Sequence, residues 1–199
     1  MSRHSRGFTI IELMVSVAVM LVLLAIAQPS FESMRQRAAI RGAGERALGL
    51  WNQARLESAK RNELVKVGVV SSGGNLCLGA ATTADRADDE ACDCMETDTA
   101  AATYCNVARF PGDQDEWRQV TLAGTPSLGS DLDGLAIIEP KRTNLTDASA
   151  AGAMTFAGPP GRWSYRLNLS VDRFGRAMLC ESTAAVDHLS DYGTRQCAD

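Results

Sequence analysis

The stretch SRGFTIIELMVSVAVMLVLLAIAQPS, residues 5–30, decides the fold because it combines a long apolar run with a single acidic residue. Residues 8–27 are almost wholly apolar, and a helix of that length rises by about 30 Å, the thickness of a bilayer's hydrocarbon core. Glu12 nevertheless lies inside this run. A carboxylate at membrane depth is costly, and such residues are usually paired and functional. Glu12 therefore needs a partner.

Three interpretations compete for this segment. It is a plain transmembrane anchor, or it is a secretory signal with basic residues in MSRHSR and a cleavage site at Ala25-Ile26-Ala27. In the third, the chain is cut between Gly7 and Phe8, which leaves a new α-amino group one helical turn from Glu12. The amine of a neighbouring copy then neutralises the carboxylate when the helices pack side by side. Only this third interpretation uses the glutamate.

The residues RGFTIIELMVSV resemble the leader and N-terminus of type IV pilins and pseudopilins. The resemblance implies that Gly7 is the last leader residue and that a prepilin peptidase cuts before Phe8, which is then N-methylated. Glu12 corresponds to the family's characteristic glutamate, which serves assembly. Pro29 falls where helices of the family are often kinked or unwound.

This resemblance also implies an organisation and a location. Residues 1–7 form the leader, residues 8–63 a long helix, and residues 64–199 a globular β domain. Within the helix, residues 8–27 serve as the transmembrane and assembly segment, and residues 28–63 form an amphipathic half. The expected place is the bacterial inner membrane, crossed once, with the C-terminal domain in the periplasm before incorporation into a filament. The expected partners are other pilins or pseudopilins, the prepilin peptidase and the inner-membrane assembly platform.

Basic residues near the apolar segment argue for the opposite orientation. Arginines are denser after it, at Arg35, Arg37, Arg41 and Arg46, than before it, at Arg3 and Arg6. The positive-inside rule alone would place the C-terminal domain in the cytoplasm. The leader and an even number of cysteines, all beyond residue 76, favour export to an oxidising compartment.

A helical pattern continues through residues 30–62, which are rich in alanine and free of proline. Ala47, Leu50, Trp51 and Ala54 fall on one face at spacings of three and four, with Trp51 as a core anchor. Phe31, Met34 and Ala38 are expected to continue that stripe. Gly42 and Gly44 weaken the middle of the helix and allow a bend there.

Beyond residue 63 the apolar period changes from helical to two, which indicates strands. The expected strands cover residues 64–70, 75–80, 116–122, 135–140, 153–158, 163–171 and 176–181. Residues 82–102 are poor in apolar side chains and read as a surface loop pinned by cysteines. The prediction is an α+β fold in which a long N-terminal helix packs on an antiparallel, sandwich-like β domain with disulfides.

A second resemblance lies in residues 154–180, MTFAGPPGRWSYRLNLSVDRFGRAMLC, which look like the closing strands of H-type pseudopilins and related minor pilins. It implies a β-sandwich behind the helix and a minor rather than a major subunit. A minor pilin of a type IV pilus, serving assembly priming, pilus biogenesis, motility or adhesion, is the favoured function. An H-type minor pseudopilin of a type II secretion system is the alternative.

Six cysteines constrain the globular part: Cys77, Cys92, Cys94, Cys105, Cys180 and Cys197. Cys92 and Cys94 are too close in sequence to pair well with each other, so they are expected to bridge to different partners. Cys180 and Cys197 enclose a short C-terminal loop and are the expected pair. The other four pair among themselves in an order that the sequence does not determine.

A metal site formed by Cys92 and Cys94 with Asp88, Asp89 or Glu90 is the rival interpretation of the cysteines. It lacks a second close cysteine pair or a histidine, so no metal is expected. His4 lies in the leader, which leaves His188 as the one candidate for imidazole chemistry and argues against histidine-based hydrolases. The prediction is a non-enzymatic structural protein without a cofactor. The competing class is a secreted, disulfide-bonded domain released by cleavage after Ala27.

Arginines near the C-terminus raise a third function, DNA binding. Arg162, Arg166, Arg173 and Arg176 could form an edge that binds phosphate. Some minor pilins that resemble this chain bind DNA during natural transformation through a Gly-Arg-x-Arg turn. Here the turn reads Gly175-Arg176-Ala177-Met178, without the second arginine. Nearby acidic residues, among them Asp172 and Glu181, would repel phosphates.

Overall fold

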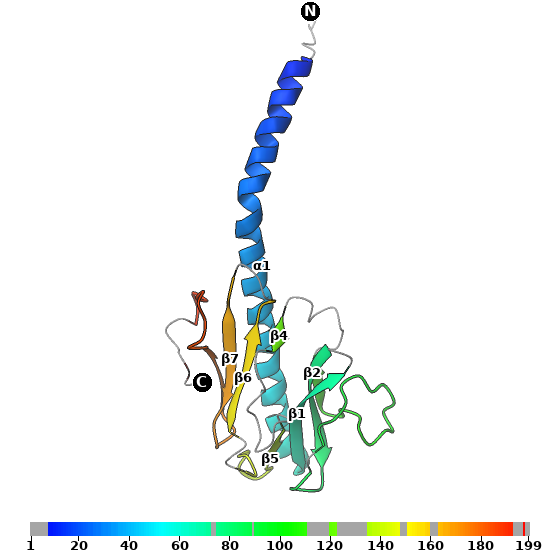
Figure 1. Ribbon diagram of the computed structural model, residues 1–199. Helices are drawn as coiled ribbons and strands as arrows, with labels where there is room; N and C mark the ends of the chain where they lie inside the picture. The colour runs from blue at the N-terminus through cyan, green and yellow to red at the C-terminus, as the bar shows by residue number, and fades with distance from the viewer. Residues whose placement is uncertain are drawn as a thin grey trace, which may run out of the picture. The chain divides into compact units, whose positions relative to one another are not determined.

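The computed structural model describes residues 8–72, 75–88, 90–110, 120–122, 135–147, 151–159, 163–192 and 197. One long helix, α1 (Ile10–Arg61), precedes a set of antiparallel strands (Figure 1). Three disulfides hold loops and the C-terminal segment of this part. The predicted α+β class is therefore confirmed. Residue contacts divide the chain into two compact units, Met1–Arg35 and Gln36–Asp199.

Helix α1 begins and ends with local capping contacts. At its C-terminal end Asn62 adopts a left-handed backbone conformation with φ of 55°, a common way to end a helix. The Glu63 amide then donates to the Ser58 carbonyl at 3.3 Å, and the Ser58 hydroxyl donates to the Glu63 carbonyl at 2.8 Å. The backbone is helical throughout Ile10–Arg61, including at Gly42, Gly44 and Pro29.

The buried stripe of α1 agrees with the prediction only in its C-terminal part. Ala47, Trp51 and Ala54 are fully buried and Leu50 nearly so, which confirms Trp51 as a core anchor. Phe31, Met34 and Ala38 are exposed instead, so the expected continuation of the stripe is wrong. Ala38 lies nine residues before Ala47, two and a half helical turns, and therefore on the opposite face. The inward positions are taken by Gln36, Ile40 and Ala43.

One four-stranded sheet has the order β3-β2-β1-β5. Its strands are β1 (Leu64–Ser72), β2 (Asn75–Thr83), β3 (Ala108–Phe110) and β5 (Ala136–Ile138). β1 and β2 form a hairpin in which Gly68 lies opposite Gly79. Val65 and Val67 of β1 face the core, so Lys66 between them faces the other side of the sheet.

The second four-stranded sheet has the order β4-β6-β7-β8. Its strands are β4 (Thr121–Leu122), β6 (Gly152–Ala157), β7 (Arg166–Val171) and β8 (Ala177–Glu181). All neighbouring pairs in it are antiparallel. β7 contributes Leu167, Leu169 and Val171 to the core.

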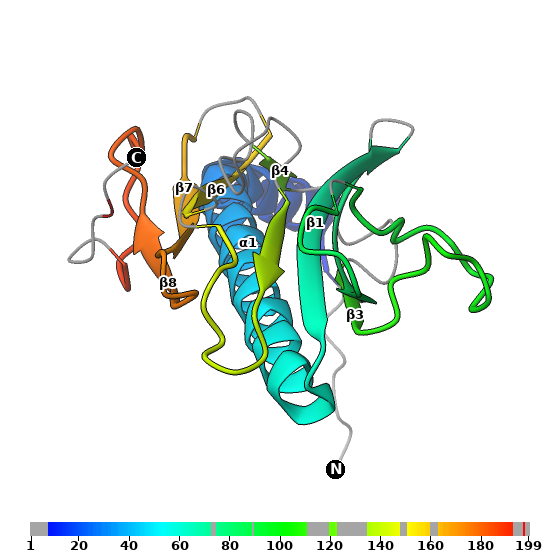
Figure 2. The ribbon, with the colours of Figure 1, turned by 90° about the horizontal axis from the view of Figure 1, so that it is seen from below.

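The main core lies where both sheets meet the C-terminal half of α1. It joins Ile40, Ala47 and Trp51 of the helix with side chains from both sheets. Figure 2 shows β6, β7 and β8 on one side of this part of α1 and β1 and β3 on the other. Gly44 permits close packing here, because a Cβ at this position would lie 2.6 Å from Cδ2 of Leu167.

The expected strands agree with the structure except at short segments. The three-residue strand β3 was not predicted, and residues 116–119 of the expected strand 116–122 lie outside the described residues, which retain only β4 from it. Strand β7 begins at Arg166 and not at residue 163 as expected. Residues 163–165 precede it without regular structure.

Candidate processing and assembly site

The described chain begins at Phe8, and a threonine–glutamate pair caps the first turn of α1. The Thr9 hydroxyl accepts a hydrogen bond from the Glu12 amide at 3.3 Å and donates to Oε2 of Glu12 at 3.4 Å. The Thr9 carbonyl accepts from the Leu13 amide at 3.2 Å, which starts the helical ladder. The contact of the Glu12 amide with the Thr9 hydroxyl is one half of a capping box, while the Glu12 carboxylate contacts the same hydroxyl. Gly7 and the leader lie outside the described residues.

The N-terminal part of α1 exposes its apolar side chains on all faces. Exposed fractions lie at 49% or more for the large apolar residues from Phe8 to Ile26. By length and composition α1 can cross a membrane, and it is the one such helix in the described part of the chain. Glu12 is exposed among these apolar side chains. The segment therefore fits a membrane anchor that carries one acidic group near its start.

The outer face of β1 and β2 carries a second, smaller core made of cysteines. Its members are Cys77, Ala81, Cys92, Cys94 and Cys105, with Val70 packed against them. Disulfides join Cys77 to Cys94 and Cys92 to Cys105, with Cα–Cα distances of 6.1 and 5.2 Å. The Cys77–Cys94 bond fastens the segment 84–107, the covering loop, onto β2, and the Cys92–Cys105 bond joins two points of that loop over Gly79. Cys92 and Cys94 thus bond to different partners.

Two glycines that pair across the hairpin let the covering loop approach the sheet. A Cβ at Gly79 would lie 2.4 Å from Sγ of Cys105 and 2.6 Å from Sγ of Cys92. A Cβ at Gly68 would lie 2.6 Å from Cβ of Ala91. All three distances are shorter than real contacts of a Cβ atom, so the loop needs a glycine without a side chain at these two places.

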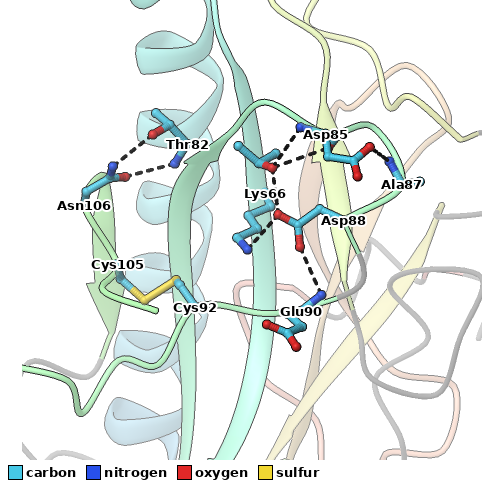
Figure 3. Close-up of polar contacts among 10 residues, drawn as sticks. Lys66, Thr82, Asp85, Ala87, Asp88, Glu90, Cys92, Cys105 and Asn106 are labelled. Carbon is cyan, nitrogen blue, oxygen red and sulfur yellow. Dashed lines mark hydrogen bonds and ion pairs between the residues drawn. A yellow bond between two sulfur atoms is a disulfide. The ribbon is translucent and has the colours of Figure 1, made fainter. Parts of the chain in front are cut away.

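A partly buried ion pair holds the near end of the covering loop (Figure 3). Nζ of Lys66 lies 2.8 Å from Oδ2 of Asp88, and the Thr83 hydroxyl donates to the same oxygen at 2.7 Å. The Glu90 amide donates to the other oxygen at 3.1 Å. Burial alone would raise the pKa of Asp88, but the hydrogen bonds from Lys66, Thr83 and Glu90 outweigh it and lower that pKa.

Acidic side chains of the covering loop serve its own turns. Carboxylates of Asp85, Asp93 and Asp98 each accept a hydrogen bond from the amide two residues later, which is an Asx-type turn. Oε1 of Glu96 accepts from the next two amides. In the described ranges no group of three histidine, cysteine, aspartate or glutamate side chains is placed to hold a metal ion.

The two candidate DNA-binding arginines that flank Phe174 are exposed at the β7–β8 turn. Their guanidinium carbons lie over the Phe174 ring, at 4.9 Å for Arg173 and 5.6 Å for Arg176. Nε of Arg176 donates to Oδ2 of Asp172 at 2.7 Å, so its charge is paired. Arg166 lies on β7, and Arg162 lies outside the described residues.

The hydrogen bonds within this turn lower the pKa of Asp172. Burial raises it, but the backbone amide and side chain of Arg176 and the amide of Phe174 donate to the carboxylate and lower it overall. Asp172 therefore stays ionised and keeps the Arg176 guanidinium in an ion pair. Among the described residues, Arg173 lies over the Phe174 ring and, unlike Arg176, forms no ion pair.

The glycine of this turn has a structural role that sequence reasoning missed. The Gly175 carbonyl accepts a hydrogen bond from the indole nitrogen of Trp51 at 2.9 Å. Gly175 has φ of 69°, and a Cβ there would lie 2.5 Å from the Thr143 carbonyl oxygen. Arg55 of α1 donates to the Thr143 hydroxyl at 2.9 Å. The turn therefore docks on α1 and on the loop after β5.

The C-terminal segment is held by a disulfide and by a buried carboxylate. Cys180 is bonded to Cys197, the pair expected from sequence, with a Cα–Cα distance of 5.4 Å. Glu181 is fully buried and accepts from the Leu189 amide at 2.7 Å. Nδ1 of His188 lies 3.1 Å from its other oxygen. His188 is thus bound to a carboxylate that positions the segment, which gives the residue a structural explanation.

Comparison with known proteins adds one finding at the N-terminus. The profile of the prokaryotic N-terminal methylation motif matches residues 2–28. No curated protein and no solved structure matches the chain significantly. The match covers Phe8, Thr9 and Glu12, whose capping geometry is described above. The chain carries the N-terminal methylation motif typical of type IV pilins and pseudopilins, which implies membrane anchoring, assembly with other pilins and a structural, pilin-like role.

Proposed function

We propose that this protein is a minor subunit of a type IV pilus. A prepilin peptidase cuts between Gly7 and Phe8, Phe8 is N-methylated, and residues 8–27 hold the subunit in the inner membrane with residues 64–199 in the periplasm. The subunit is then drawn by the assembly platform into a filament of pilins. The match of residues 2–28 to the methylation motif supports the pilin-like part of this proposal, and the resemblance of residues 154–180 to minor pilins supports the minor-subunit part.

The mechanism of assembly follows from the exposed apolar helix and its one carboxylate. Lateral packing of apolar N-terminal segments buries surface that is exposed in the single chain. Glu12 would then be enclosed by apolar side chains, where an unpaired charge is costly. The α-amino group of Phe8 on a neighbouring copy supplies the counter-charge and sets the axial register. Thr9 holds the carboxylate near the helix start through its hydroxyl.

The intact mass of the mature protein tests the processing step. Loss of the first seven residues together with gain of one methyl group supports the proposal. Loss of 27 residues, up to Ala27, would instead show a secreted domain released by an ordinary signal peptidase. A mature chain that begins at any residue other than Phe8 contradicts the pilin mechanism.

Replacement of Glu12 tests the register mechanism separately from processing. Glu12→Leu and Glu12→Gln both remove the charge, and the second keeps the size and a polar end. We expect both variants to be cut and methylated but to be lost from sheared filaments. If either enters filaments as wild type does, the ion pair does not set the register, whatever the family.

The choice between a type IV pilus and a type II secretion machine needs a deletion strain. The distal strands resemble those of minor pilins and of H-type pseudopilins alike, so this resemblance supports a minor subunit of either machine, and the pilus is the alternative that we propose. Loss of surface pili and twitching motility with normal protein secretion supports the pilus. Retention of secreted enzymes in the periplasm with intact pili supports an H-type pseudopilin.

DNA binding is a second candidate, favoured by the exposed ring of Phe174 between two guanidinium groups. Such a ring can stack on a base while an arginine contacts phosphate. The pairing of Arg176 with Asp172 weakens this candidate. Arg173→Glu with Arg176→Glu should abolish salt-sensitive DNA retention by the purified protein, and unchanged retention removes the candidate.

A further inference from the structure

The disulfides of the covering loop are interleaved along the chain. Cys77 bonds to Cys94 and Cys92 bonds to Cys105, with sequence separations of 17 and 13. The first cysteine of the second bridge therefore precedes the second cysteine of the first bridge. Cys180 and Cys197, by contrast, are consecutive cysteines. The disulfides of the covering loop are therefore the ones that do not join consecutive cysteines of the sequence.

An unfolded chain does not favour the interleaved pattern. Pairing in order would join Cys77 to Cys92 and Cys94 to Cys105, which are 15 and 11 positions apart. Since closure probability falls as the three-halves power of loop length, these shorter loops are favoured by about 1.5-fold over the native pair of loops. Cys77 and Cys92 also leave a translocation channel before Cys105 does. Before Cys105 emerges, Cys77 can therefore pair with Cys92 as well as with its native partner Cys94, so early oxidation yields wrong pairs alongside native ones.

The folded structure accepts only the native pattern and then protects it. The Cys92–Cys105 bridge passes over Gly79, where even a methyl group would collide with both sulfur atoms. All four cysteines are at most 5% exposed. Wrong bridges must therefore be exchanged before the loop closes over the sheet, since a thiolate cannot reach buried sulfur afterwards.

We propose that this protein is a substrate of a thiol–disulfide isomerase, which converts consecutive bridges in the covering loop into the interleaved native ones. The inference rests on the proposed export of the globular domain to an oxidising compartment. The partner is defined by its chemistry: a low-pKa thiolate that attacks misplaced disulfides in an open chain. A separate disulfide-bearing oxidant takes two electrons and two protons for each bridge first formed.

Three thiol–disulfide exchanges complete the conversion without net oxidation. The isomerase thiolate attacks Sγ of Cys92, forms a mixed disulfide with it and releases the Cys77 thiolate. That thiolate attacks Sγ of Cys94, which forms the Cys77–Cys94 bridge and releases the Cys105 thiolate. Cys105 then attacks Sγ of Cys92, closes the Cys92–Cys105 bridge and returns the isomerase thiolate. Each step breaks one S–S bond and forms another.

Disulfide mapping of the full chain, made in two bacterial hosts, tests the proposal. Both hosts contain the thiol oxidase, but only one of them contains the isomerase. Free thiols are blocked, and the unreduced protein is cut after basic residues and before aspartates. Cleavage at Asp93 separates Cys92 from Cys94, and cleavage at Asp98 separates Cys94 from Cys105. We expect the native pairs with the isomerase and, without it, a mixture in which a large share of the chains carries Cys77–Cys92 with Cys94–Cys105. Cys180–Cys197 should form equally in both hosts.

The double variant Cys92→Ser with Cys105→Ser is the matched control. Its remaining native pairs, Cys77–Cys94 and Cys180–Cys197, are consecutive, so their yield should be the same in both hosts. Equal yields of interleaved pairs in the wild-type chain from both hosts would overturn the proposal. An uncut leader with six free thiols would overturn the proposed export itself, and with it this inference, so intact mass tells the two failures apart.

Discussion

Trp51 is the residue whose replacement best tests how the turn between β7 and β8 is held on α1. Its side chain is fully buried, and its indole nitrogen donates to the Gly175 carbonyl at 2.9 Å. Trp51→Phe keeps an aromatic ring but removes that donor. The variant thus separates the hydrogen bond from most of the apolar burial.

The size of the effect follows from two terms. An acceptor left without its partner in the interior costs about 1–3 kcal/mol, and the smaller ring leaves a cavity worth about another 1 kcal/mol. We therefore expect a loss of about 2–4 kcal/mol in the free energy of unfolding. For a domain of this size, each kcal/mol lowers Tm by about 2–4 °C, so Tm should fall by roughly 4–16 °C.

Thermal unfolding of the full chain in detergent, followed by near-ultraviolet circular dichroism, measures this shift. Asn52→Ala is the matched control, because Asn52 neighbours Trp51 on α1 but is exposed, and it should change Tm by less than about 2 °C. If Trp51→Phe unfolds within that range of the control, the bond to Gly175 does not hold the turn. The role assigned to Gly175 would then be wrong.

Three further changes test other contacts of the globular part. Lys66→Met should lower stability by about 1 kcal/mol at pH 7. Because the folded pKa of Asp88 is lowered from 3.8, the ion pair stabilises the fold above pH 3.8, and this contribution is lost as the pH falls through the folded pKa. The Tm difference between the variant and wild type should therefore shrink in acid, and an unchanged difference refutes the pairing. Gly175→Ala should cost more than about 2 kcal/mol, measured by thermal unfolding, because φ is 69° and the Thr143 carbonyl blocks a Cβ; a neutral result would show that the turn moves freely. Gly79→Ala should lower the yield of the Cys92–Cys105 bridge in non-reducing peptide maps, whereas Gly49→Ala, whose added Cβ meets no atom within 4 Å, should leave that yield unchanged. Equal yields in the two variants would mean that the covering loop does not lie in close contact with β2.

Much of the fold could be predicted because its periodic elements are long. The C-terminal half of α1 repeats its apolar residues every three or four positions over several turns, and Trp51 with Ala47 and Ala54 identifies the buried face. Strands β1 and β2 follow from their apolar period of two, and their pairing is seen in the structure. The short strand β3 has only three residues and pairs through β2 at the sheet edge, so no local pattern marks it.

Other features depend on contacts between distant residues, which a single sequence does not reveal. Phe31, Met34 and Ala38 are apolar and spaced like a core stripe. The buried face of the helix is nevertheless the one that carries Trp51, and there Gln36 is the buried residue. The order of the cysteine pairs depends on how the covering loop lies over Gly79. A clue to that approach was available in Gly68 and Gly79, two glycines in adjacent predicted strands.

The Gly-Arg turn shows why a short motif does not determine a function. Gly175 is required by its positive φ, by the Thr143 carbonyl and by the bond from Trp51. Arg176 is required by Asp172, which it pairs with across the same turn. Both residues of the motif thus have structural explanations in this chain, and only Arg173 with Phe174 remains for a ligand. A DNA-binding role must therefore be argued from those two exposed side chains.

Glu12 presents the converse problem, since a local explanation accounts for only part of it. The contact with Thr9 explains a glutamate in the first turn of a helix. It does not explain why that turn opens an apolar segment, because an uncharged glutamine could complete a similar cap without the cost of a charge in lipid. A capping contact also leaves one carboxylate oxygen without a bond to Thr9. That oxygen is where a cation from a neighbouring chain would bind, so the cap and the proposed intersubunit pair occupy different atoms and can hold together.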